Sequence, residues 1–382
     1  MNLAVNKNER KILVLFFLII VISQGIRTDF NNKLNTCIFN YHIIPLLLVL
    51  ITIFNKKNKI NIKNIIFIIG IIGLIVLSFV INKYTYNQFF RTILSFILPL
   101  FILLIDYNNF NSGYIISKLV SIFNIFIQIT FIIQVLMSIN TGRSPGIIGH
   151  SLTTGWYYVI FISFNCIYCK YFKSKSDILI LKDVFIALIG TVLATGRVSM
   201  SIVLILGIIY TIACCKNKVL IFIIPILIII FLNTSFVDKL IWEKFRYAAS
   251  WGDITNGRLL GIREMQFYSI KPNFFYGKGL GYSNYITQYL FGTINFENPI
   301  LMFSFDYGIL TVIFLLIIIF INPLKAFIDK KNFLIAINFI LVFIVPFTYN
   351  GLAESVGLFI VLIFIIYIFL LINNAIAIKK LI

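Results

Sequence analysis

Long apolar stretches recur along the whole chain and constrain its fold more than any other feature. An α-helix of about 20 apolar residues crosses a hydrocarbon core about 30 Å thick. The alternation of a transmembrane β-barrel, with about ten residues per strand, is not seen. We therefore predict an all-α polytopic integral membrane protein with about 12 transmembrane helices, near residues 12–26, 38–54, 64–81, 92–105, 115–137, 151–169, 178–194, 198–214, 218–232, 299–321, 333–347 and 355–372.

Composition excludes a soluble globular domain. The chain is 60% hydrophobic and only 12% charged, whereas soluble domains are about 25% charged. So few charged residues could not cover the surface of a soluble fold of this size.

The charge distribution predicts the topology. The net charge is +19, which in a soluble protein would suggest nucleic acid as a partner. Here, with the N-terminus inside, nineteen of the 32 basic residues fall in connections on the cytoplasmic side and six in the opposite short connections. The positive-inside rule then predicts that both termini are cytoplasmic. Nucleic acid is not an expected partner.

One long polar interval, residues 233–298, could not lie inside a membrane. We interpret it as a large extracytoplasmic loop between the ninth and tenth spans, which divides the chain into spans 1–9 (1–232), the loop, and spans 10–12 (299–382). Helical spacing within the loop predicts an interfacial helix over 256–270, with Arg258 in its first turn and Arg263 beyond it. The first four and last two spans are expected to be lipid-facing scaffold, with Glu354 as an extra partner on the outer side.

Several polar side chains are expected at this outer face. Arg197 lies in a tight turn between two apolar spans, and Arg143 and His150 lie in another outer connection. A guanidinium group suits phosphate or carboxylate recognition, but an arginine at the membrane edge can also snorkel to the interface. Glu297 ends the large loop, where it could act as a general base or as a salt-bridge partner.

Two further motifs carry weaker signals. Cys166 and Cys169 have CxxC spacing, but no second pair accompanies them, so we expect packing thiols and no metal site. The run Gly277-Lys278-Gly279-Leu280-Gly281 lacks the ending of a P-loop. We interpret it as a turn whose glycines let backbone approach a ligand.

Together these motifs resemble the O-antigen polymerase and O-antigen ligase superfamily, which includes the Wzy-type polymerases of lipopolysaccharide and capsule pathways. The resemblance covers the order of motifs over roughly residues 140–320: Arg143 to His150, Thr195-Gly196-Arg197, Gly257-Arg258, Lys271-Pro272 to Gly281, Glu297 to Leu301, and Asp306-Tyr307-Gly308. Ligases of the superfamily usually carry a histidine before the asparagine that ends the loop, where this chain has Glu297. That departure favours a polymerase.

The resemblance implies a metal-independent membrane glycosyltransferase without a cofactor. Its substrates, as donor and acceptor, would be oligosaccharides linked to polyprenyl (undecaprenyl) pyrophosphate, used at the outer face of the bacterial cytoplasmic membrane. Arg197 and Arg258 would stabilise the pyrophosphate leaving group, and Glu297 would be the base, with His150 as the second candidate. Arg143, His150 and Arg263 are the candidate substrate-binding residues. Membrane lipid and a chain-length regulator protein are the other expected partners.

Three alternatives stay open from the residues alone. An O-antigen ligase would use the same chemistry on another acceptor. A flippase or exporter of lipid-linked glycan would also have many spans, although paired repeats and charges within the spans would be more typical of it. A structural membrane protein would not need the arginines of the loop.

Overall fold

The computed structural model describes residues 62–82, 89, 92–104, 112–141, 144–217, 219–220, 233–250, 258–290, 296–354 and 356–381. All regular structure in these ranges is helical, without a strand. Five of the described helical segments are long and apolar enough to cross a membrane: Asn64–Asn82, Ile116–Ser138, Arg197–Cys214, Ile309–Asp329 and Leu358–Ile378. The spans predicted at 12–26 and 38–54, and nearly all of 218–232, lie outside the described residues.

The described residues from 62 to 217 form five long helices and a short broken region. Helix α4 spans Ile62–Asn82, and a set of short turns follows, namely η1 (Ile93–Ile97), α6 (Leu98–Leu100) and η2 (Phe101–Leu104). The next elements are α7 (Ser112–Thr141), η4 (Gly146–Ile148), α8 (Ser151–Tyr171), α9 (Asp177–Leu193) and α10 (Arg197–Cys214). The stretch predicted as one span at 92–105 is thus divided into three short elements, and Pro99 lies in the middle one.

The described parts of the polar interval, 233–250, 258–290 and 296–298, form short helices and turns, and apolar helices follow them. It contains α12 (Ser235–Val237), η5 (Asp238–Trp242), α13 (Glu243–Ser250), α14 (Arg258–Phe267), α15 (Tyr282–Tyr285) and η6 (Ile286–Leu290). The elements after it are α16 (Pro299–Tyr307), α17 (Ile309–Leu316), η7 (Ile317–Ile321), α18 (Asn322–Asp329), α19 (Phe333–Ile344), η8 (Val345–Thr348), α20 (Gly351–Glu354) and α21 (Val356–Leu381).

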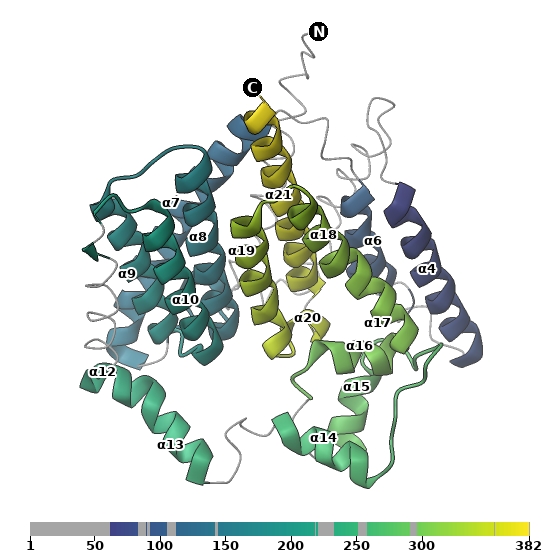
Figure 1. The fold of residues 1–382 in the computed structure, drawn as a ribbon. Coiled ribbons are helices and arrows are strands. Elements are labelled where there is room, and N and C mark those ends of the chain that lie inside the picture. The colour runs from purple at the N-terminus through teal and green to yellow at the C-terminus, as the bar shows by residue number, and fades with distance from the viewer. Residues whose placement is uncertain are drawn as a thin grey trace.

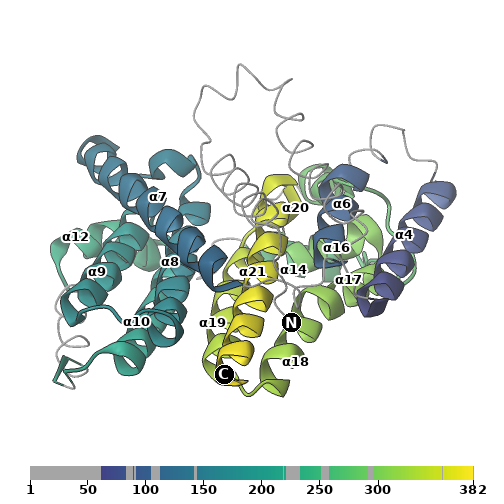
Figure 2. The ribbon, with the colours of Figure 1, turned by 90° about the horizontal axis from the view of Figure 1, so that it is seen from above.

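Helices α7 to α10 pack together on one side of the molecule, and α4, α6, α16 and α17 lie on the other (Figures 1 and 2). Helix α8 is buried along almost its whole length because it contacts α7, α9, α10 and α19. Helices α8 and α10 are parallel, since Gly155 lies beside Ser199 near their starts and the Cys214 thiol lies 3.6 Å from the Cys166 carbonyl near their ends.

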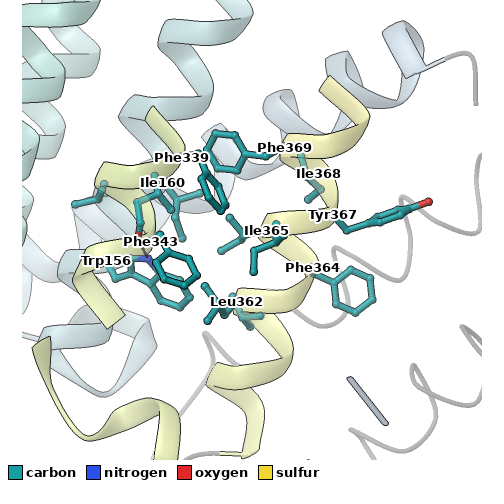
Figure 3. Packing of buried hydrophobic residues seen from close by; sticks show 14 of the residues in the cluster. Trp156, Ile160, Phe339, Phe343, Leu362, Phe364, Ile365, Tyr367, Ile368 and Phe369 are labelled. Carbon is teal, nitrogen blue, oxygen red and sulfur yellow. Dashed lines mark hydrogen bonds between the residues drawn. The ribbon is translucent and has the colours of Figure 1, made fainter. Parts of the chain in front are cut away.

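Helix α21 lies between these two groups, and its residues from Leu358 to Asn374 are all buried. Its side chains meet those of α8 and α19, as Figure 3 shows for Phe369, Phe339 and Ile160. The expectation that the last span is lipid-facing is therefore wrong. A helix that is apolar on all sides can be surrounded either by lipid or by protein, and its sequence does not distinguish the two.

The apolar helix predicted at 299–321 begins later than predicted. Gly308, with φ +94°, separates α16 from α17, and the continuous apolar helix runs from Ile309 to Asp329. Helix α17 packs against α4, where the rings of Phe314 and Phe67 meet edge to face at 5.7 Å. Helix α16 is thereby a separate element that precedes the span.

Helices α12 to α16 and α20 lie at one end of the molecule, and α21 ends at the other (Figure 1). Near that second end the Lys175 ammonium group lies 2.6 Å from the buried carboxylate of Asp183. Lys175 also donates to Asn165, and Lys330 donates to Asn374 of α21. We call the end that holds α12 to α16 the loop end.

Candidate functional site

Two connections that carry predicted site residues lie side by side at the loop end. The Ser144 N–H donates to the Leu193 carbonyl at 3.1 Å. The buried Gln134 amide donates to the carbonyls of Ser144 and Gly190, and it accepts from the Tyr158 hydroxyl at 2.7 Å. These bonds hold the segment before His150 against the turn before Arg197.

The starts of α8 and α10 form the centre of this site. His150 is the N-cap of α8, and Arg197 is the first residue of α10. A Cβ at Gly155, in the second turn of α8, would lie 2.7 Å from the Ser199 hydroxyl in the first turn of α10, so the two helices are in close contact near their starts. Because the helices are parallel, both dipoles direct their positive ends toward the loop end, where the half-buried Arg197 begins α10. This arrangement favours an anion.

The imidazole ring of His150 is held in one orientation by a hydrogen bond and a ring contact. Its Nδ1 accepts from the Thr153 N–H at 3.4 Å and lies 3.1 Å from the Thr153 hydroxyl. Its ring stacks on the buried ring of Tyr349 with centroids 5.9 Å apart, and the Tyr349 hydroxyl lies 3.5 Å from that of Thr153. When Nδ1 accepts, a neutral imidazole carries its proton on Nε2. His150 is then better suited to donate to a bound oxygen than to act as a base.

Glu297 has a strained backbone between two anchors. Its φ of +48° is in the left-handed region, which costs a non-glycine residue about 1–3 kcal/mol. On one side Phe296 is buried and stacks on Phe305 at 5.4 Å. On the other side the Asn298 side chain accepts from the first N–H groups of α16, at 3.0 and 3.2 Å. The half-buried carboxylate is thus held at the start of α16.

The segment formed by η8, Tyr349, Asn350 and α20 joins these parts, and we call it the central connection. Its η8 turn contacts α8, α10 and α16, and α20 also contacts α16. Ala353 packs against the cluster of Phe296 and Phe305. The elements that carry His150, Arg197 and Glu297 therefore meet on one short segment. Sequence reasoning missed Tyr349, for which the only signal is a turn flanked by Pro346 and Gly351.

The remaining predicted residues lie in or near α14. Arg258 begins this helix and Arg263 is exposed on it. Met265 of α14 packs against the cluster that contains Phe296, which connects the helix to the Glu297 segment. Arg143 lies outside the described residues, and of Glu354 the structure gives only the position at the end of α20.

The backbone of the glycine-rich turn packs against the end of α16. The sequence had instead predicted that its glycines let backbone approach a ligand. A Cβ at Gly277 would lie 2.1 Å from the Asp306 carbonyl oxygen, so the backbone of the glycine-rich turn lies directly against the end of α16. The N–H groups of Lys278 and Gly279 donate to the carbonyls of Phe305 and Asp306 at 3.0 and 2.9 Å. The Gly-x-Gly pattern therefore serves backbone packing here.

The side chain of Asp306 completes this contact. Its two oxygens accept from the N–H groups of Gly281 and Ser283 at 3.0 and 2.8 Å. Burial raises the pKa of the Asp306 carboxyl group from its ordinary 3.8 to about 7, and the N–H donors of Ser283 and Gly281 oppose that shift. The two motifs Gly277–Gly281 and Asp306–Gly308, far apart in sequence, form one unit.

One arginine of the polar interval is already paired. Arg246 donates to both oxygens of Asp238, at 2.9 and 2.8 Å, on the exposed surface of η5 and α13. The hydrogen bonds from Arg246 also lower the pKa of the Asp238 carboxyl group. Arg246 is therefore a suitable control arginine outside the site.

Metal-ligating side chains do not gather at this site. Within the described part of the chain, no group of three or more histidine, cysteine, aspartate or glutamate residues could hold a metal ion. The four described cysteines, Cys166, Cys169, Cys214 and Cys215, are free thiols.

No protein-family model, no curated protein and no solved structure matches the chain.

Proposed function

We propose that the chain is a polysaccharide polymerase of the O-antigen or capsule type in the bacterial cytoplasmic membrane. It would transfer a glycan from polyprenyl pyrophosphate onto another lipid-linked repeat unit at the extracytoplasmic face, with about 12 spans and both termini in the cytoplasm. One observation carries the proposal. The parallel helices α8 and α10 carry His150 and Arg197 at their N-terminal ends, and the central connection contacts both helices and α16, which follows Glu297.

The chemistry of that transfer needs what these groups offer. The bond from the anomeric carbon of the donor to its phosphate oxygen breaks, and polyprenyl pyrophosphate leaves with the electron pair. Arg197, the two helix N-termini and the His150 N–H would stabilise the charge that develops there, and loss of one such donor costs about 10²–10³-fold in rate. In our proposal Arg258 also contacts the pyrophosphate.

The acceptor sugar supplies the nucleophile. Its hydroxyl oxygen would bond to the anomeric carbon while its proton passes to the Glu297 carboxylate. A single displacement inverts the anomeric configuration. Arg143 and Arg263 would bind the glycan or its phosphates in this scheme.

The decisive experiment measures the length of lipid-linked glycan formed by variants in membranes. Arg197→Ala and Glu297→Gln should each lower polymerisation by about 10²-fold or more, and Arg197→Lys should restore only part of it because it loses the planar fork. Arg246→Ala is the matched control, because that guanidinium group is paired with Asp238 on the surface. Full activity of membrane-inserted Arg197→Ala would contradict the proposal.

The product that accumulates without the protein separates polymerisation from related activities. Single repeat units on the outer face, with no long chains, support the polymerase. Long chains stranded on the lipid carrier would indicate a ligase. Repeat units held on the cytoplasmic side would indicate a flippase, and the roles assigned to Arg197 and Glu297 would then fall.

A further inference from the structure

A pair of exposed aromatic rings lies on the segment Asn273–Gly277, which we call the aromatic strap. Phe274 and Phe275 are 47% and 54% exposed, and their rings meet edge to face at 5.0 Å. The N–H groups of Phe275 and Tyr276 both donate to the Asn273 side chain, which tightens the turn. Two large exposed rings on such an ordered turn suggest that they face something other than water.

The strap is hydrogen-bonded to the ends of two candidate spans. The carbonyls of Asn273 and Phe274 accept from the N–H groups of Ile309 and Leu310, at 3.0 and 2.9 Å, where the apolar segment Ile309–Asp329 begins. On its other side the strap reaches the end of α4. The Gly277 N–H donates to the Ser78 hydroxyl at 3.1 Å, and the Asn82 amide donates to the Gly277 carbonyl at 2.9 Å.

These bonds fix the depth of the strap relative to a membrane. If α4 and the helix from Ile309 cross the bilayer, their ends at Asn82 and Ile309 mark the boundary of the hydrocarbon core. The strap spans these two ends, so its rings lie at the level where aromatic side chains are enriched in membrane proteins. Exposed lysines, Lys271 and Lys278, flank the strap in sequence, and long basic side chains near helix ends reach the polar interface.

We propose that Phe274 and Phe275 insert into the lipid leaflet at the loop end, at the boundary between headgroups and acyl chains. The occupant of this surface is the bilayer itself, and the inference does not depend on the proposed enzymatic activity. Because Lys278 and Gly279 bond to the end of α16, the inserted strap would also hold the glycine turn and Asp306 at a fixed height above the membrane.

A second aromatic pair provides an internal control. Phe267 and Tyr268 are 80% and 53% exposed and also meet edge to face, at 5.1 Å. They lie at the end of α14. Figure 1 shows that α14 lies farther toward the loop end than the point where α4 ends. The two pairs thus have similar chemistry and exposure but different positions relative to the spans.

The test is fluorescence quenching of single added tryptophans by brominated lipid. Phe275→Trp and Phe267→Trp chains are placed in nanodiscs of phosphatidylcholine, either unlabelled or brominated near the carbonyl end of the acyl chains. The three native tryptophans contribute to every sample, so the readout is the difference from the unsubstituted chain. Both substitutions replace one exposed aromatic ring by another, and monodisperse elution shows that each variant is folded.

The expected result is that the added signal of Phe275→Trp falls about twofold or more in brominated lipid, as for a ring at the interface, while that of Phe267→Trp changes little. Equal quenching of both would show that the whole polar interval lies on the lipid, which overturns the assignment to the strap. Absence of quenching at Phe275→Trp would also overturn the proposal. Phe274 and Phe275 would then be assigned to contact with a protein partner instead of lipid.

Discussion

Substitution of Gly277 by alanine tests the contact between the glycine turn and the end of α16. The added Cβ would lie 2.1 Å from the Asp306 carbonyl oxygen and 2.2 Å from the Tyr307 nitrogen. Both are backbone atoms, so no side chain can rotate away to make room. Either α16 shifts as a unit or the strap moves away from it.

The cost follows from the contacts that must change. Overpacking of this kind costs about 1–3 kcal/mol. If the strap moves away, the bonds of Gly277 to Ser78 and Asn82 weaken as well, at about 1 kcal/mol each. We expect a total of about 3–5 kcal/mol and a midpoint of thermal unfolding lower by about 5 °C.

The natural assay uses a maleimide dye that fluoresces when it reacts with thiols. Three of the four described cysteines, Cys166, Cys169 and Cys215, are buried, and their exposure on heating reports unfolding. Gly73→Ala is the matched control, because Gly73 is in α4 and a Cβ there would meet nothing within 4 Å. The reasoning is refuted if Gly277→Ala unfolds at the same temperature as Gly73→Ala.

Two further predictions concern charge. Because burial raises the pKa of Asp306 from 3.8 to about 7, the folded chain binds this proton more tightly than the unfolded chain between those values. The resulting stability is fully present below pH 3.8 and is lost as the pH rises through 7, by on the order of 4 kcal/mol in all. Unfolding midpoints should therefore fall as the pH rises from about 4 to about 7, and Asp306→Asn should not show this step. Lys175→Met should lower stability by about 3 kcal/mol because it leaves the buried Asp183 carboxylate without its cationic partner, whereas Arg246→Ala on the exposed Asp238 pair should change the unfolding midpoint little. Equal midpoints for these two variants would contradict the role of burial.

Much of the fold could be predicted from local sequence. The spans predicted at 178–194 and 198–214 coincide with α9 and α10 because a glycine-containing turn interrupts an otherwise apolar pattern at residues 194–196. The helix predicted at 256–270 is present as α14, Arg258–Phe267. In each case neighbouring residues alone determine where the backbone can continue as a helix.

The site could be predicted only in part. The connections that hold His150 and Arg197 were expected on one face, and the structure places them side by side through the bonds of Gln134. Tyr349 was not predicted, because its role depends on the ring of His150, which is 199 positions away in sequence. No pattern local to residue 349 encodes that contact.

Local sequence is sufficient to predict that the described chain is helical, where many of its helices lie, and which polar residues fall in their connections. Those properties depend on local hydrogen bonding and on apolar length. Packing between distant segments instead buries α21 at the centre, brings Gly277 against Asp306, and brings α8 and α10 together near their starts. Local sequence does not encode these contacts because apolar side chains are equally satisfied by lipid and by protein. Which surface an apolar helix meets is therefore decided by shape and close backbone contact between segments far apart in the chain.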